Sequence, residues 1–328
     1  MKKQILFICG SINQTTQMHQ IAQELPEYGH CFSPYYCDGF LERLRRRNMV
    51  EYTILGNKMV NRCLSYLKAH DLPVDYQGAN NFYDLVLTCA DLIIPGNILD
   101  KKIMLIQEGM TDPENWLSAL VKRYRVLPRW LASTSANGTS DLFDVFCVAS
   151  EGYREHFIRK GVQPEKIVIT GIPNFDNCRR FLENDFPHRH FVLVCTSDSR
   201  ETFRYENRKK FIRDCTAIAN GRPLLFKLHP NENIERATWE INTYAPGALV
   251  FATGDTNAMI ANSDALITQY SSTVYVAMAL DKEVHSYFDI EELRRLLPIQ
   301  NGRAAKNIAD VCRSMLEGAP VAKSAVGS

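Results

Sequence analysis

The sequence predicts an α/β protein made of two Rossmann-like domains whose parallel sheets face a cleft. Short apolar runs alternate with amphipathic stretches, which is typical of β-α-β units and parallel sheets. The alternation restarts after residue 187, and both halves open with an apolar strand, a small polar loop (GSINQTT or TSDSRET) and a helix. The 328 residues also fit two domains of about 150 residues each.

Five apolar runs predict buried strands in the first half. They span residues 3–10, 83–91, 101–109, 142–150 and 166–173. Helices are expected at 16–25 and 151–161, where apolar residues recur on one face. Ser150 is the expected N-cap of the second helix, and Gly161 its end.

The second half repeats this alternation. Its predicted strands span 190–197, 223–230, 248–253, 265–272 and 283–289. Helices are expected between them, at about 203–219, 232–245, 255–263 and 273–280. The chain therefore divides into an N-terminal domain (1–175), a C-terminal domain (176–302) and a final segment (303–328) with a last helix and a frayed tail.

Composition and charge exclude several classes of protein. With 38 basic and 37 acidic residues, the chain lacks the basic surplus of duplex-binding proteins, so no nucleic acid partner is expected. No apolar run approaches the ~18 residues of a membrane span, and no signal peptide opens the chain. These two absences, together with ten cysteines scattered without a paired motif, predict a reduced, cytoplasmic protein.

Several motifs that bind cofactors or metals do not occur in the sequence. The glycine fingerprint G-x-G-x-x-G and the phosphate loop G-x-x-x-x-G-K-[ST] are both missing, which disfavours dinucleotide redox chemistry and P-loop hydrolysis. There is also no D-x-D motif in a loop. We therefore expect neither a cofactor nor a metal.

The strand-turn-helix at 265–280 carries the first candidate binding site. Tyr270-Ser271-Ser272-Thr273 joins an apolar strand to the helix VYVAMAL. Hydroxyls and free backbone N–H groups at a helix N-terminus form an anion site suited to a diphosphate. The alternative is that Ser272 or Thr273 is an ordinary N-cap.

The segment FKLHPNEN (226–233) carries the second candidate site. His229 ends a strand, where its imidazole can donate to a phosphate oxygen or a leaving group, or simply bond backbone in a turn. Glu232 and Asn233 follow at a helix start, where they can reach ribose hydroxyls, although Glu232 is also a favourable first-turn acid. In a nearby loop, Arg200 is either an extra phosphate contact or an exposed cation.

Three segments in order, SEGYREHFIRKGVQPEKIVITGIPNFD, KLHPNEN and ALITQYSSTVYVAMALDKEV, resemble the nucleotide-sugar enzymes of GT-B fold. They are most similar to the CDP-glycerol glycerophosphotransferase-like group, which has KLHP and a TDYSS turn. A more distant similarity is to non-hydrolysing UDP-N-acetylglucosamine 2-epimerases. The resemblance implies that the donor diphosphate is held by His229, Ser271, Ser272 and Thr273.

The resemblance has two further consequences. Gln269 stands where the family pattern has Asp. This protein can therefore use a different class of nucleotide donor from the one that the resemblance implies. A GT-B fold also implies that the last helix, at about 303–317, crosses back onto the first domain.

The first half would then hold the acceptor. A loop after the first strand faces the cleft and contains Gly10, Ser11, Asn13 and Thr15. Transfer to a hydroxyl needs a base, for which we rank Glu108 first, Asp112 second and His19 third. Glu108 ends a buried strand, where an acid needs a partner. The alternatives are structural: a turn acid at Glu108, a helix cap at Asp112 and a packing role for His19.

Two segments of the first half are rich in basic residues, namely 116–133, which also holds Trp and Tyr, and 41–47. Such a composition suits peripheral contact with an anionic membrane surface. The alternative is a solvated helix face whose aromatic residues lie in the core. The near-neutral net charge again disfavours RNA.

These observations predict a metal-independent glycosyltransferase of GT-B type in cell-surface glycan or glycolipid synthesis. Its expected partners are a nucleotide-sugar donor and a glycan or lipid-linked acceptor. Three alternatives remain: a glycerophosphotransferase-like enzyme, a non-hydrolysing sugar-nucleotide epimerase and a noncatalytic sugar-nucleotide-binding protein.

Overall fold

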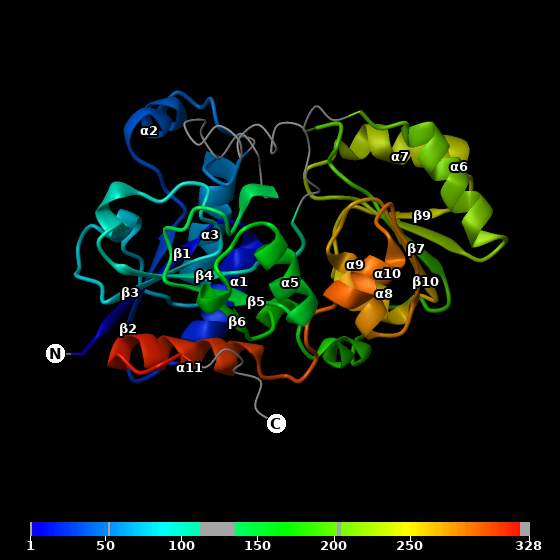
Figure 1. The fold of residues 1–328 in the computed structure, drawn as a ribbon. Helices are drawn as coiled ribbons and strands as arrows, with labels where there is room; N and C mark the ends of the chain where they lie inside the picture. Colours follow the sequence, from blue (N-terminus) through cyan, green and yellow to red (C-terminus); the bar gives the residue numbers. More distant parts are fainter. Residues whose placement is uncertain (1, 52, 112–134, 202–204, 322–328) are drawn as a thin grey trace. The chain divides into compact units, whose positions relative to one another are not determined.

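The computed structural model describes residues 2–51, 53–111, 135–201 and 205–321. The chain divides into two compact units, unit 1 (Met1–Asp176 with Asn301–Ser328) and unit 2 (Asn177–Gln300). Each unit is built on one parallel sheet flanked by helices (Figure 1). The prediction of an α/β protein with two parallel sheets is therefore confirmed.

The sheet of unit 1 has six parallel strands in the order β2-β1-β3-β4-β5-β6. They are β1 (Gln4–Cys9), β2 (Gly29–Pro34), β3 (Leu85–Thr88), β4 (Lys102–Ile106), β5 (Val145–Val148) and β6 (Ile167–Ile169). Most are nearly continuous apolar runs because both faces of a parallel sheet are buried. The edge strand β2 (GHCFSP) has no such run, which is why the sequence did not predict it.

The helices of unit 1 include α1 (Ile12–Gln23), α2 (Gly39–Arg46), α3 (Asn57–Ala69), α5 (Glu151–Arg159) and α11 (Ala304–Glu317). α1, α3 and α11 share one apolar core with the strands, so α11 packs in unit 1 although it follows unit 2 in the chain. The predicted N-cap Ser150 is confirmed, because its side chain accepts the Tyr153 N–H at the start of α5.

The prediction of a loop at residues 10–16 is correct for Gly10 and Ser11 and wrong from Ile12 onward. The Ser11 side chain caps α1 by accepting the N–H of Gln14 (3.2 Å), so the helix already begins at Ile12. The early start follows from the cap, because a serine oxygen satisfies one of the free N–H groups of a helix N-terminus.

The sheet of unit 2 has five parallel strands in the order β11-β10-β7-β8-β9. They are β7 (Val192–Cys195), β8 (Leu224–Lys227), β9 (Leu249–Phe251), β10 (Ala265–Thr268) and β11 (Glu283–His285). The helices include α6 (Arg208–Ala219), α7 (Ile234–Tyr244), α8 (Thr256–Asn262), α9 (Thr273–Ala279) and α10 (Ile290–Leu296). α6 and α7 cover one face of this sheet, and α8, α9 and α10 lie over the other (Figure 1).

Asp176 fixes the start of α11 within unit 1. Its buried carboxylate accepts backbone N–H groups from Gly302 (2.7 Å) and Ala304 (2.8 Å). One turn later, the amide of Asn307 donates to the carbonyl of Thr170 (3.0 Å), just after β6. The negative charge also favours the positive end of the helix dipole.

We predict that Asp176→Ala lowers the free energy of unfolding by about 2 kcal/mol, because two N–H groups lose their acceptor. The thermal melting midpoint of the purified protein measures this effect. Asp185→Ala removes an exposed carboxylate and should change stability by less than about 0.5 kcal/mol. Equal melting midpoints for the two variants would show that Asp176 does not stabilise the start of α11.

Candidate functional site

Polar residues follow four neighbouring strands of unit 2 at their carboxyl ends. The strands pair in the order β11-β10-β7-β8. Ser286 follows β11, Gln269–Thr273 follow β10, Ser197 follows β7 and His229 follows β8. Because parallel strands end at the same edge, the sheet places these residues along one side of unit 2, where α/β proteins bind ligands.

The backbone around His229 holds the imidazole in a defined state. The His229 N–H donates to Thr196 Oγ1 (3.1 Å) and to Glu232 Oε2 (3.0 Å). The N–H of Asn231 donates to His229 Nδ1 (3.3 Å), so in the neutral ring Nε2 carries the hydrogen. The half-exposed His229 can therefore donate a hydrogen bond from Nε2 to a ligand oxygen.

A buried ion pair lies beneath His229. Glu232 Oε1 is 2.5 Å from Arg208 Nη2, and the hydroxyl of Thr196 donates to Glu232 Oε2. Arg208 also donates to the carbonyl of Ser197 (3.2 Å), which ties the loop after β7 to the same pair. Arg208 and Thr196 could not be predicted as partners of Glu232, because nothing in their spacing along the sequence indicates that they meet it.

Burial also shifts the pKa values of two other ionisable residues near the carboxyl ends of these strands. Burial raises the pKa of Glu206, although the nearby Arg208 and Arg200 oppose the shift. Burial lowers the pKa of Lys227, the last residue of β8, whose Nζ donates to the carbonyls of Leu228 (2.9 Å) and Ala252 (3.3 Å). Lys227 is thus occupied by backbone and acts as a structural residue.

The hydrogen bonds of Glu232 and Arg200 contradict the contacts with the donor that were expected of these two residues. Glu232 is buried and bonded at both oxygens, so it positions His229 and cannot reach a ribose. Arg200 is neither exposed nor available to a phosphate, because it forms a bidentate pair with Glu240 (2.7 and 2.8 Å). Asn233 caps α7, its Oδ1 accepting the N–H of Arg236 (2.8 Å), and its exposed side chain keeps the Nδ2 amide, so its contact with a ribose stays a prediction.

The turn before α9 presents hydroxyl groups at this edge. Ser271 Oγ accepts the N–H of Thr273 (3.3 Å) and the Thr273 hydroxyl (2.9 Å). Ser272 stands at the N-cap position, but its side chain makes no capping hydrogen bond. Gln269 Oε1 accepts the hydroxyl of Ser197 (2.7 Å), so Gln269 joins the ends of β10 and β7.

In unit 1, the carboxylate of Glu108 is held by the start of α1. Glu108 follows β4, and its two oxygens accept the hydroxyl of Ser11 and the amide of Gln14, each at 2.6 Å. Both donors are side chains of distant residues and not groups of the turn that contains Glu108. A carboxylate oxygen has two lone pairs, so each can accept a further hydrogen bond from a ligand.

Gly10 makes this arrangement possible. A Cβ at Gly10 would overlap Gln14 Oε1, which is buried and has no hydrogen-bond partner among the described residues. Any larger residue would therefore push the Gln14 amide away from Glu108. Gly10 and Ser11 were predicted near this site, but Gln14 was not, because the segment was expected to be a loop and not the first turn of a helix.

Other residues expected on the acceptor side do not join Glu108. Thr15 is wholly buried, and its hydroxyl bonds the carbonyl of Ser11 (2.9 Å). Asn13 lies in the first turn of α1, where its carbonyl accepts the amide of Asn174 (2.6 Å). Asp112 lies outside the described residues.

His19 packs against α3 and is not placed to act as a base. Its Nδ1 shares a hydrogen bond with the hydroxyl of Tyr66 (3.0 Å). His19 lies five residues beyond Gln14, so it is about 7.5 Å further along α1 from the strand ends. Burial, followed by the nearby His70, lowers the pKa of His19.

Of the two basic segments, the structure describes 41–47 but not 116–133. In α2, Glu42 pairs with Arg45 (2.7 Å) and Arg46 (3.0 Å), and these contacts lower the pKa of Glu42 to about 2. Over the part of the chain that the structure describes, no helix has the length and apolar character needed to span a bilayer.

The two sheets with their connecting helices define an α/β protein of GT-B fold, the class that the sequence motifs resemble. No protein-family model matches the sequence. No curated protein is significantly similar to it in sequence.

Solved structures similar to this chain come from both groups that its motifs resemble. MnaA of S. aureus, in a structure with UDP, has a TM-score of 0.60 at 12% identity, covering 99% of this chain and 100% of MnaA. The wall teichoic acid polymerase TagF gives 0.55 at 12% identity, covering 97% and 90%. A UDP-N-acetylglucosamine 2-epimerase gives 0.55 at 11% identity, covering 97% of each chain. Identities this low show a common fold.

We predict that Glu232→Gln destabilises the protein by about 2 kcal/mol, because the buried Arg208 then keeps only Glu206 (3.0 Å) as a charged partner. Glu235→Gln, three residues further on, is the matched control because Glu235 is exposed. Urea unfolding of both variants measures the difference. If Glu232→Gln were as stable as Glu235→Gln, the buried pair would not hold the loop of His229.

Proposed function

We propose that this chain is a glycosyltransferase that moves a sugar or related group from a nucleotide-activated donor to an acceptor hydroxyl. Unit 2 would bind the donor, and unit 1 the acceptor. The observation that carries the proposal is the set of hydrogen-bond donors at the carboxyl edge of unit 2. The fold shared with MnaA and TagF, whose structures were solved with UDP and CDPG respectively, supports a nucleotide-linked ligand.

The donor site would use hydrogen bonds to stabilise a diphosphate leaving group. β10 and β8 both pair with β7, so their ends are about 10 Å apart. His229 Nε2–H on one side and the hydroxyls of Ser271 and Ser272 on the other can therefore contact one nucleotide. The Thr273 hydroxyl would join them by turning from Ser271 to the ligand. Preorganised donors of this kind stabilise the charge that develops as the bond to the leaving group breaks.

Glu108 would act as the base that takes the proton from the acceptor hydroxyl. Ser11 and Gln14 hold its carboxylate in one orientation, and each oxygen keeps a lone pair that can accept a proton. A glycerophosphotransferase differs only in that the hydroxyl attacks the donor phosphorus. The same base serves both reactions.

We predict that one of UDP, CDP, CMP, GDP and dTDP raises the melting temperature in a thermal-shift screen. At about 100 times the dissociation constant, the ligand adds about 2.7 kcal/mol of stability. His229→Ala and Ser271→Ala should reduce this shift, whereas His190→Ala, which removes a highly exposed ring, should not. If no nucleotide stabilises the protein, the proposed donor site is wrong.

We predict that Glu108→Gln lowers the rate of nucleoside diphosphate release in the presence of acceptor by about 10²–10⁴-fold, because the amide cannot take a proton. Nucleotide affinity should be unchanged. The exposed Glu165→Gln is the control and should keep the full rate. An unchanged rate in Glu108→Gln would exclude this residue as the base, and conversion of the donor sugar without acceptor would indicate an epimerase.

A further inference from the structure

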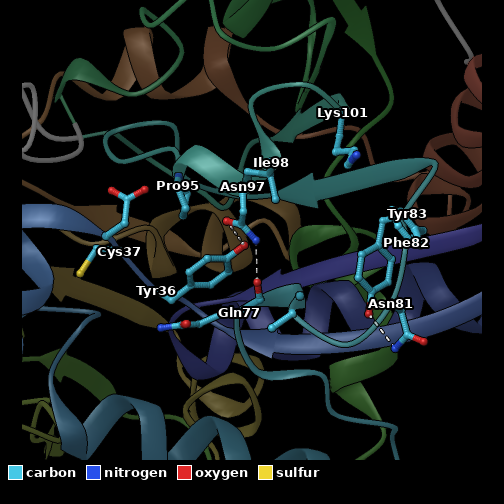
Figure 2. Close-up of a pocket in the computed structure, with 13 residues that line it drawn as sticks. Tyr36, Cys37, Gln77, Asn81, Phe82, Tyr83, Pro95, Asn97, Ile98 and Lys101 are labelled. Carbon is cyan, nitrogen blue, oxygen red and sulfur yellow. Dashed lines mark hydrogen bonds between the residues drawn. The ribbon is translucent and has the colours of Figure 1, made fainter.

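Unit 1 contains a pocket of about 460 Å³ that none of the candidate site residues lines. Three segments form it, namely the turn after β2 (Tyr36–Asp38), residues 77–83, and the segment between β3 and β4 that includes Asn97 and Lys101 (Figure 2). The volume lies in the range of small-molecule sites.

Hydrogen bonds hold the polar wall of this pocket in place. The hydroxyl of Tyr36 donates to Asn97 Oδ1 (3.2 Å), and Asn97 Nδ2 donates to the carbonyl of Gln77 (2.8 Å), as Figure 2 shows. At the rim, the N–H of Gly96 donates to Asp38 Oδ2 (2.6 Å). The wall is therefore preformed, which lowers the entropic cost of binding.

The lining offers hydrogen-bond acceptors and an exposed aromatic ring. Among the described residues, Asp38 Oδ1 and Asn81 Oδ1 have no hydrogen-bond partner, so both can accept from a ligand. Phe82 stands at the pocket with 89% of its surface exposed. A ligand that covers this ring with C–H groups would remove apolar surface from water.

Other ligand classes fit this lining less well. An anion would find one cation, Lys101, which already pairs with Asp100 (2.9 Å). Burial raises the pKa of Cys37 to about 11, so the pocket presents a neutral thiol rather than a reactive thiolate. No cluster of His, Cys, Asp and Glu among the described residues is arranged to hold a metal.

We propose that this pocket binds a neutral saccharide or polyol unit, with its hydroxyls donating to Asp38 and Asn81 and its C–H face on Phe82. This inference rests on the proposed function, because it makes the pocket a subsite for the acceptor. β2 and β4 are three strand spacings apart, so Tyr36–Asp38 lie about 14 Å from the strand that carries Glu108. The pocket therefore holds a unit of the acceptor other than the one that reacts.

Saturation-transfer difference NMR on the full chain tests this site directly. The probes are glycerol, glucose, N-acetylglucosamine, maltotriose and chitotriose, with inorganic phosphate as an anionic competitor. We expect at least one of the five to bind, and phosphate not to displace it. Phe82→Ala and Asp38→Asn should each weaken that binding about tenfold, equal to about 1.4 kcal/mol.

Phe40→Ala is the matched control because Phe40 is 67% exposed and does not line the pocket. It should leave binding unchanged, and all three variants should keep the wild-type melting temperature. The proposal is overturned if none of the five probes binds, if phosphate displaces them, or if Phe82→Ala and Asp38→Asn bind as tightly as wild type. Saccharide binding without any nucleotide shift would retain the pocket and reject the proposed donor site, and the opposite pattern would do the reverse.

Discussion

The buried ion pair between Glu232 and Arg208 is the interaction on which the candidate donor site depends. A charge in the protein interior is tolerated only when it is paired and hydrogen-bonded. Here that requirement joins the ends of two strands to the start of a helix, because Thr196 follows β7, His229 follows β8, and Arg208 begins α6. The orientation of the His229 backbone is thus a consequence of neutralising one buried carboxylate.

In unit 1, a carboxylate at a strand end is stabilised by neutral hydrogen-bond donors and not by a buried cation. Glu108 follows β4, yet its partners Ser11 and Gln14 belong to the first turn of the helix after β1. In both units, a carboxylate after one strand bonds to residues that follow another strand. The difference is that Glu232 is fully enclosed, whereas Glu108 stays partly exposed and can meet a substrate.

The sequence predicted the elements whose apolar pattern is strong. Both sheets were foreseen from their continuous apolar runs, and so were most helices. The edge strand β2 has no such run and was missed. Side-chain partners were harder to predict, because Glu232, Arg200 and His19 bond to residues 24, 40 and 47 positions away in the chain, and spacing does not reveal which distant residues meet.

The placement of α11 has a consequence for synthesis of the chain. Unit 2 is continuous from Asn177 to Gln300, so it can complete its core as soon as it has emerged from the ribosome. Unit 1 must wait, because Ile308, Cys312 and Met315 close its core from the far end of the sequence. The first unit to be translated is therefore the last to finish folding, and until then its unfinished apolar face is exposed to aggregation and to chaperones.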